Sequence, residues 1–308
     1  MQDYSQSLKL MGNIFTITVL AETETEGQQY IALAVDEIKR IEQLLTTFSN
    51  TSQTSSINEN AGIQPVKVDT EVYHLIERSI QVSKITQGAF DITYGGIDKS
   101  LWNFDRSMTS LPSKEEALKS VHLINYKNIL LNPEEGTVFL KEKGMRIGFG
   151  GIGKGYAAEM AKNLLVQHNV VGGIINASGD LTAWGLQPTG KPWKIGISNP
   201  DSPEHVFSYL DISGKAVATS GNYEKYIMVG GKKYSHTIDP KTGLPITSIK
   251  SVTVITGNAE FADAMATPIA VMGIKAALYM VNQVPNLHCI IIDDNNKLYT
   301  SKGINLKT

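Results

Sequence analysis

The sequence predicts an α+β fold, in which strands cluster more than they alternate with helices. Residues 14–21 (IFTITVLA) alternate between apolar and polar side chains, and this period of two predicts a strand. Residues 31–45 and 152–164 carry apolar side chains three to four positions apart, the period of a half-buried helix. Strand-like runs then gather after residue 172, which favours α+β over an alternating α/β sheet.

The composition is that of an ordinary globular chain. The 308 residues have a formal charge of −2 and are 42% apolar, enough for one large domain or two fused ones. The small net charge argues against a non-specific nucleic-acid binder. No apolar run approaches the roughly 18–20 residues of a transmembrane segment. The single cysteine, Cys289, lies in LHCIIID and is expected to be a buried thiol, so an internal disulfide is excluded.

In the N-terminal half, the helix over 31–45 is expected to end near Thr46. The polar residues 48–62 predict a loop or flexible lid. Asp69 is expected to cap a second helix, and SKEE at 113–116 has the Ser-x-x-Glu form of a capping box. A hairpin is predicted for the runs NILLN and TVFLKE, which are separated by the turn residues PEEG.

The sequence of the C-terminal half predicts a cluster of strands and three helices, one of them irregular. A helix whose apolar stripe is Ile152, Tyr156, Met160 and Leu164 is expected to close at Gly172. The runs GGIINAS, KIGIS, AVATS and KYIMV predict strands. Residues 259–273 predict a helix that Pro268 must kink or divide. IKAALYMVNQ predicts another helix, and CIIID and KLYTS predict the last strands.

The stretch GFGGIGKGYAAE (148–159) has the G-x-G-x-x-G spacing but lacks the other features of the common phosphate loops. A Rossmann turn needs an acidic residue at the end of the next strand, and GGIINAS offers none at that distance. A P-loop needs Ser or Thr after the lysine, but Gly155 follows Lys154. Consecutive glycines before a helix still favour an anion site, with a tight turn that binds nothing as the alternative.

Two further segments carry candidate functional side chains. His236 lies among turn residues in HTIDPKTGLP, and of the six histidines it has the surroundings most typical of a functional group. Asp263 and Thr267 are four positions apart in ADAMAT, so the predicted helix presents a carboxylate and a hydroxyl on one face. Such oxygen ligands suit Mg²⁺ or Ca²⁺. A surface Asp beside a Thr that bonds to its own backbone is the alternative.

Taken in order, these segments resemble the ApbE family, the FAD:protein FMN transferases. The matching motifs, which span nearly the whole chain, are LMGNIFTI, TFSNTSQTSSIN, TQGAFDITYGG, GFGGIGKGYAAE, NASGDLTAWG, VATSGNYEKY, HTIDPKTGLP and ADAMAT. The resemblance implies one family domain over 8–303, with a T-fold-like α+β structure of two similar sheet-and-helix halves and the flavin site between them. It also implies a magnesium-dependent reaction in which a protein hydroxyl attacks the FMN-side phosphorus of FAD and AMP leaves.

The resemblance assigns roles to particular residues. The substrate FAD is expected to contact Met11, Phe48, Ala89, Phe90, Asp91, Gly150, Lys154, Tyr156 and Asp180. The metal, Mg²⁺ with Ca²⁺ as the alternative, is expected to bind the Gly153 carbonyl, Asp263 and Thr267, and His236 is expected to be the general base. The chain departs from the family pattern at Gly148, where many members have Asp, at Phe48, where members often have Tyr, and at Ser178 and Pro268.

The expected partner is an acceptor protein with a Ser or Thr flavinylation segment, a subunit of a redox complex. A periplasmic or membrane-anchored location, reached through a leader that this sequence does not show, is the expectation, with a cytoplasmic location as the alternative. Three other functions stay open. The same site could let water attack, as an FAD pyrophosphatase, or the chain could carry FAD without turnover. A flavin or nicotinamide oxidoreductase is disfavoured by the missing ribose acid.

Overall fold

The computed structural model describes residues 1–98, 101–102, 110–200, 202–221 and 226–304. Its main element is an eight-stranded sheet in which every neighbouring pair is antiparallel. In spatial order the strands are β1 (Gln2–Leu10), β2 (Asn13–Ala21), β6 (Gly173–Ala177), β7 (Asp180–Trp184), β10 (Lys215–Gly221), β13 (Ile249–Thr256), β14 (His288–Asp293) and β15 (Leu298–Thr300).

Three small sheets accompany the large one. They are β3 (Val66–Lys67) with β5 (Thr137–Leu140) and β4 (Ile129–Asn132), the hairpin β8 (Trp193–Asn199) and β9 (Ser202–Ile212), and the hairpin β11 (Tyr226–Val229) and β12 (Lys232–Ser235). The helices are α1 (Glu24–Leu45), α2 (Gln53–Glu59), α3 (Thr70–Ile85), α4 (Lys114–Ser120), α5 (Gly153–Gln167), α6 (Ala259–Met272) and α7 (Ile274–Val281), with short 3₁₀ helices η1 (Ile92–Gly96) and η3 (Tyr126–Asn128).

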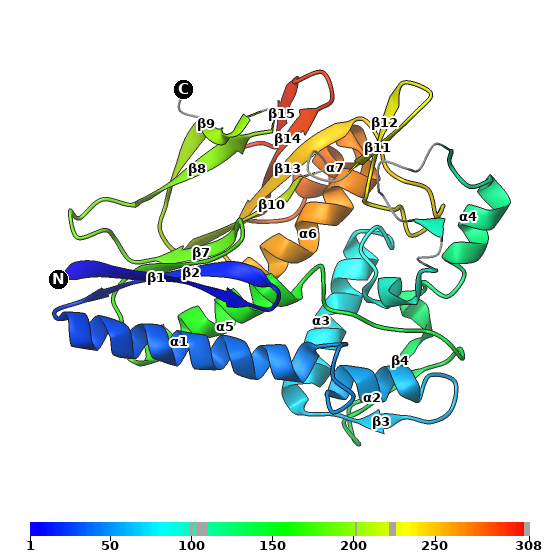
Figure 1. The fold of residues 1–308 in the computed structure, drawn as a ribbon, viewed down its shortest axis with the longest axis horizontal. Helices are drawn as coiled ribbons and strands as arrows, with labels where there is room; N and C mark the ends of the chain where they lie inside the picture. Colours follow the sequence, from blue (N-terminus) through cyan, green and yellow to red (C-terminus); the bar gives the residue numbers. More distant parts are fainter. Residues whose placement is uncertain (99–100, 103–109, 201, 222–225, 305–308) are drawn as a thin grey trace.

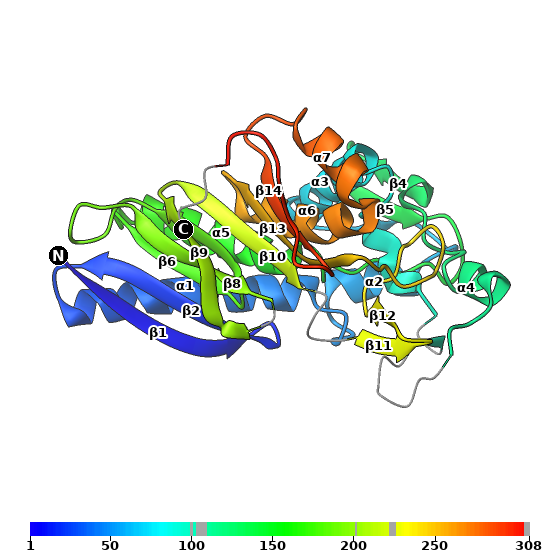
Figure 2. The same ribbon diagram turned by 90° about the horizontal axis from the view of Figure 1, so that it is seen from above.

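The two faces of the large sheet are covered differently. Helices α1, α5, α6 and α7 pack on one face, where Phe15, Ile17 and Val19 of β2 join the main core. The β8–β9 hairpin lies over the other face, where Trp193 and Ile197 join a second, smaller core. Figure 1 shows α1 and α5 on one side of the sheet and β8–β9 on the other, and Figures 1 and 2 both show β8–β9 in the left half of the molecule and α2, α4 and β11–β12 in the right half.

Many of the expected elements are confirmed. The strand over 14–21 is β2, and the first helix ends at Leu45, just before Thr46. The capping box is complete, because the Ser113 side chain accepts from the Glu116 N–H and the Glu116 carboxylate accepts from the Ser113 N–H. The predicted hairpin is β4–β5. Cys289 is fully buried, and burial raises the pKa of its thiol to about 12.

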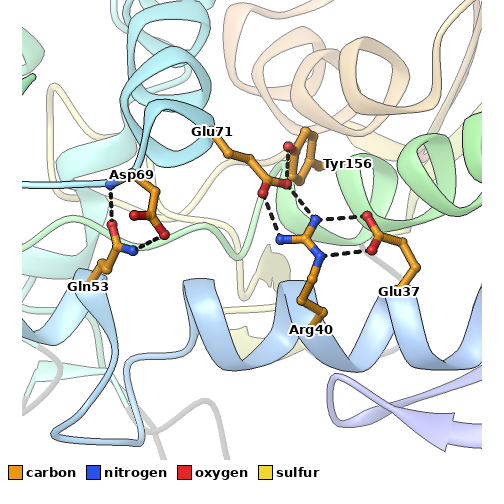
Figure 3. A network of polar contacts seen from close by, with 6 residues as sticks. All are labelled: Glu37, Arg40, Gln53, Asp69, Glu71 and Tyr156. Carbon is orange, nitrogen blue, oxygen red and sulfur yellow. Dashed lines mark hydrogen bonds and ion pairs between the residues drawn. The ribbon is translucent and has the colours of Figure 1, made fainter.

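The expected loop over 48–62 is wrong, because it contains the helix α2. Ser52 caps this helix by accepting from the Ser55 N–H at 3.0 Å. Thr54 donates to the Leu45 carbonyl at 3.0 Å, and Ile57 is buried, so contacts with the rest of the fold stabilise a sequence with little helical pattern. The Asp69 side chain makes no capping bond to α3 and instead accepts from Gln53 on α2 (Figure 3).

Two helices differ from the sequence expectation. Helix α5 ends at Gln167, five residues before Gly172. Helix α6 runs through Pro268 undivided, because its buried residues hold it against the sheet, so the expected division is wrong and the expected kink stays a prediction. Strands β1, β3, β7, β9, β12 and β13 were not expected, although β13 is buried along its whole length. Among the described residues, no helix is long and apolar enough to span a membrane.

Asn58 ties α2 to the start of the glycine stretch, and removing its side chain should destabilise the fold. Its amide donates to the Ile147 carbonyl at 3.0 Å, and its carbonyl oxygen accepts from the Ile147 N–H at 2.7 Å. Asn58→Ala leaves both buried backbone groups unpaired and should lower the free energy of unfolding by about 2–4 kcal/mol, measured by urea denaturation. Gln64→Ala, which removes an exposed bond to Asn60, should change it by less than about 0.5 kcal/mol.

Candidate active site

A cleft of about 970 Å³ opens between the β8–β9 hairpin and the outer face of the large sheet. The start of α5, one face of α6 and the residue after β12 close one end of it. The sheet contributes a polar floor that includes Thr16, Thr18, Asn176, Thr219 and Thr253. The cleft is therefore a polar cavity in which separate parts of the chain meet.

Six residues assigned from the sequence line this cleft. They come from four separate segments and are Gly150, Lys154, Asp180, His236, Asp263 and Thr267. A tight turn places Asp180: Ser178 and Gly179 have φ values of 53° and 100°, and they join β6 to β7 so that Asp180 begins β7 directly opposite Ala177. The fold thus gathers charged groups that lie far apart in the sequence.

Lys154, Asp180 and Asp263 form a buried charged cluster. The Lys154 ammonium contacts the Asp180 carboxylate, whose other oxygen accepts from the Thr219 N–H at 3.3 Å. The Asp263 carboxylate accepts from the Gly155 N–H at 2.9 Å, at the start of α5. Asp180 and Asp263 are 4% and 7% exposed, so two nearly buried carboxylates share one ammonium group.

This imbalance shifts the acidities of the cluster. The pKa of Asp263 is raised to about 7, mainly because burial disfavours the charged carboxylate and also because Asp180 is near; Lys154 opposes the rise. Burial also raises the pKa of Asp180. Burial lowers the pKa of Lys154, but the charges of Asp263 and Asp180 outweigh it and the net change is upward. An added cation would stabilise both carboxylates in their charged form.

The donor set suits a hard divalent cation. Asp263 and Thr267 lie one turn apart on α6 and both line the cleft, and Gly153 lies at the facing start of α5. Within the described part of the chain, no three His, Cys, Asp or Glu side chains group as a metal site, so side-chain carboxylates alone would not complete a coordination shell. Mg²⁺ commonly binds one or two carboxylates and takes its other ligands from water and substrate phosphates.

Gly150 and Gly155 have different surroundings in the structure, and these explain differently why each position carries glycine. A Cβ at Gly155 would lie 2.1 Å from the Ala259 carbonyl oxygen and 2.7 Å from the Asp263 Cβ, so only glycine lets α5 meet α6 this closely. A Cβ at Gly150 would meet nothing within 4 Å, although Gly150 lines the cleft. The protein therefore leaves space for a ligand beside Gly150. The preceding strand β5 belongs to a small sheet, which fits neither a Rossmann turn nor a P-loop.

A rigid loop presents His236, which is exposed at the cleft. The loop closes on itself through the bridge between Ile238 and Pro245 and through bonds from the Lys241 N–H and the Thr242 hydroxyl to the Asp239 carboxylate. This arrangement places an imidazole near the buried cluster without embedding it in the core.

The other assigned residues lie outside the lining of the cleft. Met11 sits in the β1–β2 turn near the start of α5, and Phe90 packs behind Gly151. The Asp91 carboxylate accepts from the N–H and hydroxyl of Thr93 and from the Tyr126 N–H, and burial raises its pKa. Ala89 is buried, Phe48 is 98% exposed and Gly153 is the first residue of α5. The FAD contacts expected at Met11, Phe48, Ala89, Phe90 and Asp91 and the metal contact expected at Gly153 stay predictions.

Tyr156 points away from the cleft. Its hydroxyl donates to the Glu71 carboxylate on α3 at 2.6 Å, and Figure 3 shows this contact between α3 and α5. Two residues apart on a helix means about 200° of rotation, so Lys154 and Tyr156 cannot face the same side. The apolar stripe from Ile152 to Leu164 already carried that signal.

Sequence reasoning missed the floor and the roof of the cleft. Thr16 and Thr18 alternate with the buried Phe15 and Ile17 on β2, so the alternation that predicted the strand also marked a polar outer face. Lys194 on β8 lines the cleft and lies over the Tyr209 ring at 4.1 Å. No local pattern indicated that this hairpin folds over the sheet.

Comparison with known sequences relates nearly the whole chain to one family. The ApbE family model matches residues 11–291. An FAD:protein FMN transferase of Klebsiella pneumoniae (strain 342) is 29% identical over 306 residues, which cover 99% of this chain and 93% of that protein. A protein of the same description from Escherichia coli (strain K12) is 30% identical over 248 residues, with 79% and 70% covered.

Solved structures share the fold. The crystal structure of the ApbE protein from Thermotoga maritima has a TM-score of 0.87 and 31% identity, and the match covers 98% of this chain and 97% of that one. The apo form of the Pseudomonas stutzeri flavinyl transferase ApbE has a TM-score of 0.83 over 98% and 96% of the two chains, at 23% identity. The expected α+β fold of this family is confirmed, whereas the 8–303 boundaries and the similarity of two halves stay predictions.

Two glycine substitutions should separate packing from open space. Gly155→Ala forces a methyl group against the Ala259 carbonyl, so it should lower the free energy of unfolding by about 1–3 kcal/mol or more. Gly150→Ala adds the same group in open space and should change that free energy by less than about 0.5 kcal/mol. Urea denaturation of the two variants measures the difference, and equal losses would contradict it.

The raised pKa of Asp263 predicts a pH-dependent stability in metal-free protein. Between pH 4 and 7 the folded state keeps a proton that the unfolded state releases, so this group makes stability fall as the pH rises to about 7. Asp263→Asn removes that dependence. The free energy of unfolding of this variant, compared with that of the parent chain, should therefore increase by a few kcal/mol as the pH rises through this window. Urea denaturation in EDTA measures it; the exposed Asp36→Asn is the control, and a constant difference for Asp263→Asn would disprove the shift.

Proposed function

This chain belongs to the ApbE family, and we propose that it is an FAD:protein FMN transferase that moves the FMN part of FAD onto a Ser or Thr hydroxyl of an acceptor protein. Its curated relatives carry that description, at 29% identity over 99% of this chain in one case. The observation that supports the proposal most directly is the meeting of Lys154, Asp180, Asp263, Thr267 and His236 in one polar cleft.

The reaction exchanges one phosphorus–oxygen bond for another. The acceptor oxygen bonds to the FMN-side phosphorus of FAD, the bond from that phosphorus to the bridging oxygen breaks, and AMP leaves with that oxygen. His236 takes the proton of the attacking hydroxyl, a role that typically contributes about 10²–10⁴-fold. Its exposed position at the cleft lets an acceptor segment reach it from outside.

The residues of the buried cluster would compensate the negative charge of the FAD phosphates during the transfer. Lys154 faces the cleft and would pair with phosphate oxygens, and Gly150 leaves space for them. Asp263 and Thr267, with the Gly153 carbonyl, would hold Mg²⁺, which would neutralise part of the charge on the pyrophosphate. Asp180 keeps Lys154 charged and fixed, because the two groups are in contact. Ca²⁺ would suit the same oxygen ligands.

The proposal extends to the acceptor and to its location. By the family resemblance, the acceptor is a subunit of a redox complex that presents a Ser or Thr in a flavinylation segment. We further propose a periplasmic or membrane-anchored location, which the same resemblance implies, with a cytoplasmic location as the alternative. A cleft whose lining combines the carboxylates of Asp180 and Asp263 with Lys154 and Lys194 has no excess of positive charge, so it suits a flavin nucleotide and a protein segment better than a nucleic acid.

The test combines the chain with FAD, Mg²⁺ and a protein that carries a family-type Ser/Thr acceptor segment. AMP release together with flavin fluorescence that survives denaturation is the expected result. AMP without covalent flavin would favour the pyrophosphatase activity. Tight FAD binding without AMP would overturn the transferase and favour an FAD carrier.

His236→Ala should abolish transfer while FAD binding remains within about threefold of the parent chain, because the variant removes a base and leaves the phosphate contacts. Asp263→Ala should lose both the transfer and its dependence on Mg²⁺. The assay is AMP release under saturating FAD, with binding followed by flavin fluorescence. His168→Ala, at the exposed end of α5, is the control, and a His236→Ala variant with the parent rate would remove the base assignment.

A further inference from the structure

A chain of polar contacts joins α1, α3 and α5 behind the cleft. The Arg40 guanidinium on α1 binds the Glu37 carboxylate at 2.8 Å through two nitrogens, and it binds the Glu71 carboxylate on α3 at 2.7 and 2.9 Å. The Tyr156 hydroxyl on α5 donates to Glu71 at 2.6 Å. Figure 3 shows the Arg40 fork between the two carboxylates and Tyr156 above Glu71. Tyr156 is therefore the only member of this chain of contacts that comes from α5.

A second branch links the same tyrosine to α6. Arg78 on α3 donates to the Glu260 carboxylate at 2.7 and 3.0 Å, and its guanidinium lies 5.7 Å from the centre of the Tyr156 ring. Glu260 lies in the first turn of α6 and is 7% exposed. A hollow of about 580 Å³ beside these residues offers no unpaired charge among them, because Glu71, Arg78 and Glu260 are all in ion pairs.

Both branches end next to residues of the cleft. Tyr156 follows Gly155, whose N–H bonds to Asp263, and lies two positions after Lys154. Glu260 lies three positions before Asp263 on the same helix. The contacts of Tyr156 and Glu260 thus hold α5 and α6 in place from the side opposite the cleft, one helical turn or less from the charged cluster.

Helix α5 depends on these contacts because few local interactions stabilise its first turn. Its N-cap residue, Ile152, makes no side-chain capping bond, and its first three residues are Gly153, Lys154 and Gly155. Two glycines and no cap leave the first turn with little local restraint. The Arg40 guanidinium lowers the pKa of Glu71, and burial raises the pKa of the 3% exposed Tyr156, so a protonated hydroxyl faces a charged carboxylate.

We propose that Tyr156 is a positioning residue for the transfer reaction: its bond to Glu71, which Arg40 holds in place, sets the rotation of α5 and so the placement of Lys154 and Gly155 beside Asp180 and Asp263. This inference rests on the proposed function, and it gives Tyr156 a role in place of the FAD contact expected from the sequence. It predicts that removing the Tyr156 hydroxyl changes the rate of the reaction and its dependence on Mg²⁺, whereas the affinity for FAD stays the same.

The test compares Tyr156→Phe with Tyr30→Phe. Tyr30 also donates to a glutamate, Glu26 at 2.8 Å, but it does so within α1 and outside the cleft lining, so the two variants lose the same kind of bond. Four quantities are measured: the FAD dissociation constant, AMP release at saturating FAD, the Mg²⁺ concentration for half-maximal rate, and amide hydrogen exchange over residues 153–158. Glu71→Gln, which weakens the Arg40 fork, is a second variant on the same chain of contacts.

For Tyr156→Phe we expect AMP release to fall about 10-fold, the half-saturating Mg²⁺ concentration to rise about 5-fold and exchange over 153–158 to speed up, because small displacements in a reacting site are costly. The FAD dissociation constant should stay within about threefold, and Tyr30→Phe should match the parent chain. Glu71→Gln should follow Tyr156→Phe, and it decides the matter if Tyr156→Phe does not fold.

Two results would overturn the proposal. If Tyr156→Phe matched Tyr30→Phe in rate, Mg²⁺ response and exchange, the contact would have no positioning role. If rate and FAD affinity fell together, Tyr156 would act through FAD binding. A parent chain that released no AMP would contradict the transferase function separately; the positioning role would then stand or fall on hydrogen exchange and on Mg²⁺ affinity measured by titration calorimetry.

Discussion

The site depends on one electrostatic constraint: two nearly buried carboxylates, Asp180 and Asp263, share the single ammonium of Lys154. Burying two negative charges beside one positive charge is unfavourable unless other groups compensate. The fold supplies part of the compensation from the backbone, since the N–H groups of Gly155 and Thr219 point at these carboxylates and the start of α5 carries partial positive charge. The remainder is what a divalent cation would provide, so the same imbalance that costs stability prepares the site for metal.

The two sides of α5 have different functions: one side faces the cleft, and the other packs against the rest of the protein. The side that faces the cleft carries Lys154 and the open space beside the glycine stretch, while the opposite side carries Tyr156 and its ion-paired neighbours on α1 and α3. Between them, Gly155 removes the side chain that would keep α5 from α6. The first turn of α5, which has few local contacts, is thus held by contacts on its far side and by close packing against α6.

The sequence predicted best those elements that local interactions stabilise. The Ser113–Glu116 capping box and the alternation in β2 needed no knowledge of distant residues. Helix α2 could not be predicted in this way, because Asn58 is bonded to Ile147, 89 positions along the chain. The order of motifs identified six residues that line the cleft. It also implied an FAD contact for Tyr156, whose side chain helical geometry separates from that of Lys154. The run KIGIS predicted part of β8, but the position of the β8–β9 hairpin over the sheet could not be predicted locally, since packing against the sheet sets it.

The strand order also has a consequence for how the protein folds during its synthesis. Strand β2 must wait for β6, more than 150 residues later, and the Gly155–Asp263 bond spans 108 positions, so nearly every contact of the site joins distant parts of the chain. Such non-local pairing is slow to form and exposes sheet edges in the meantime. The charged cluster can therefore assemble only after α6 has left the exit tunnel, late in synthesis. Until then the nascent chain has no complete pocket with which to bind or cleave a flavin nucleotide, and the edges of its incomplete sheet stay unpaired.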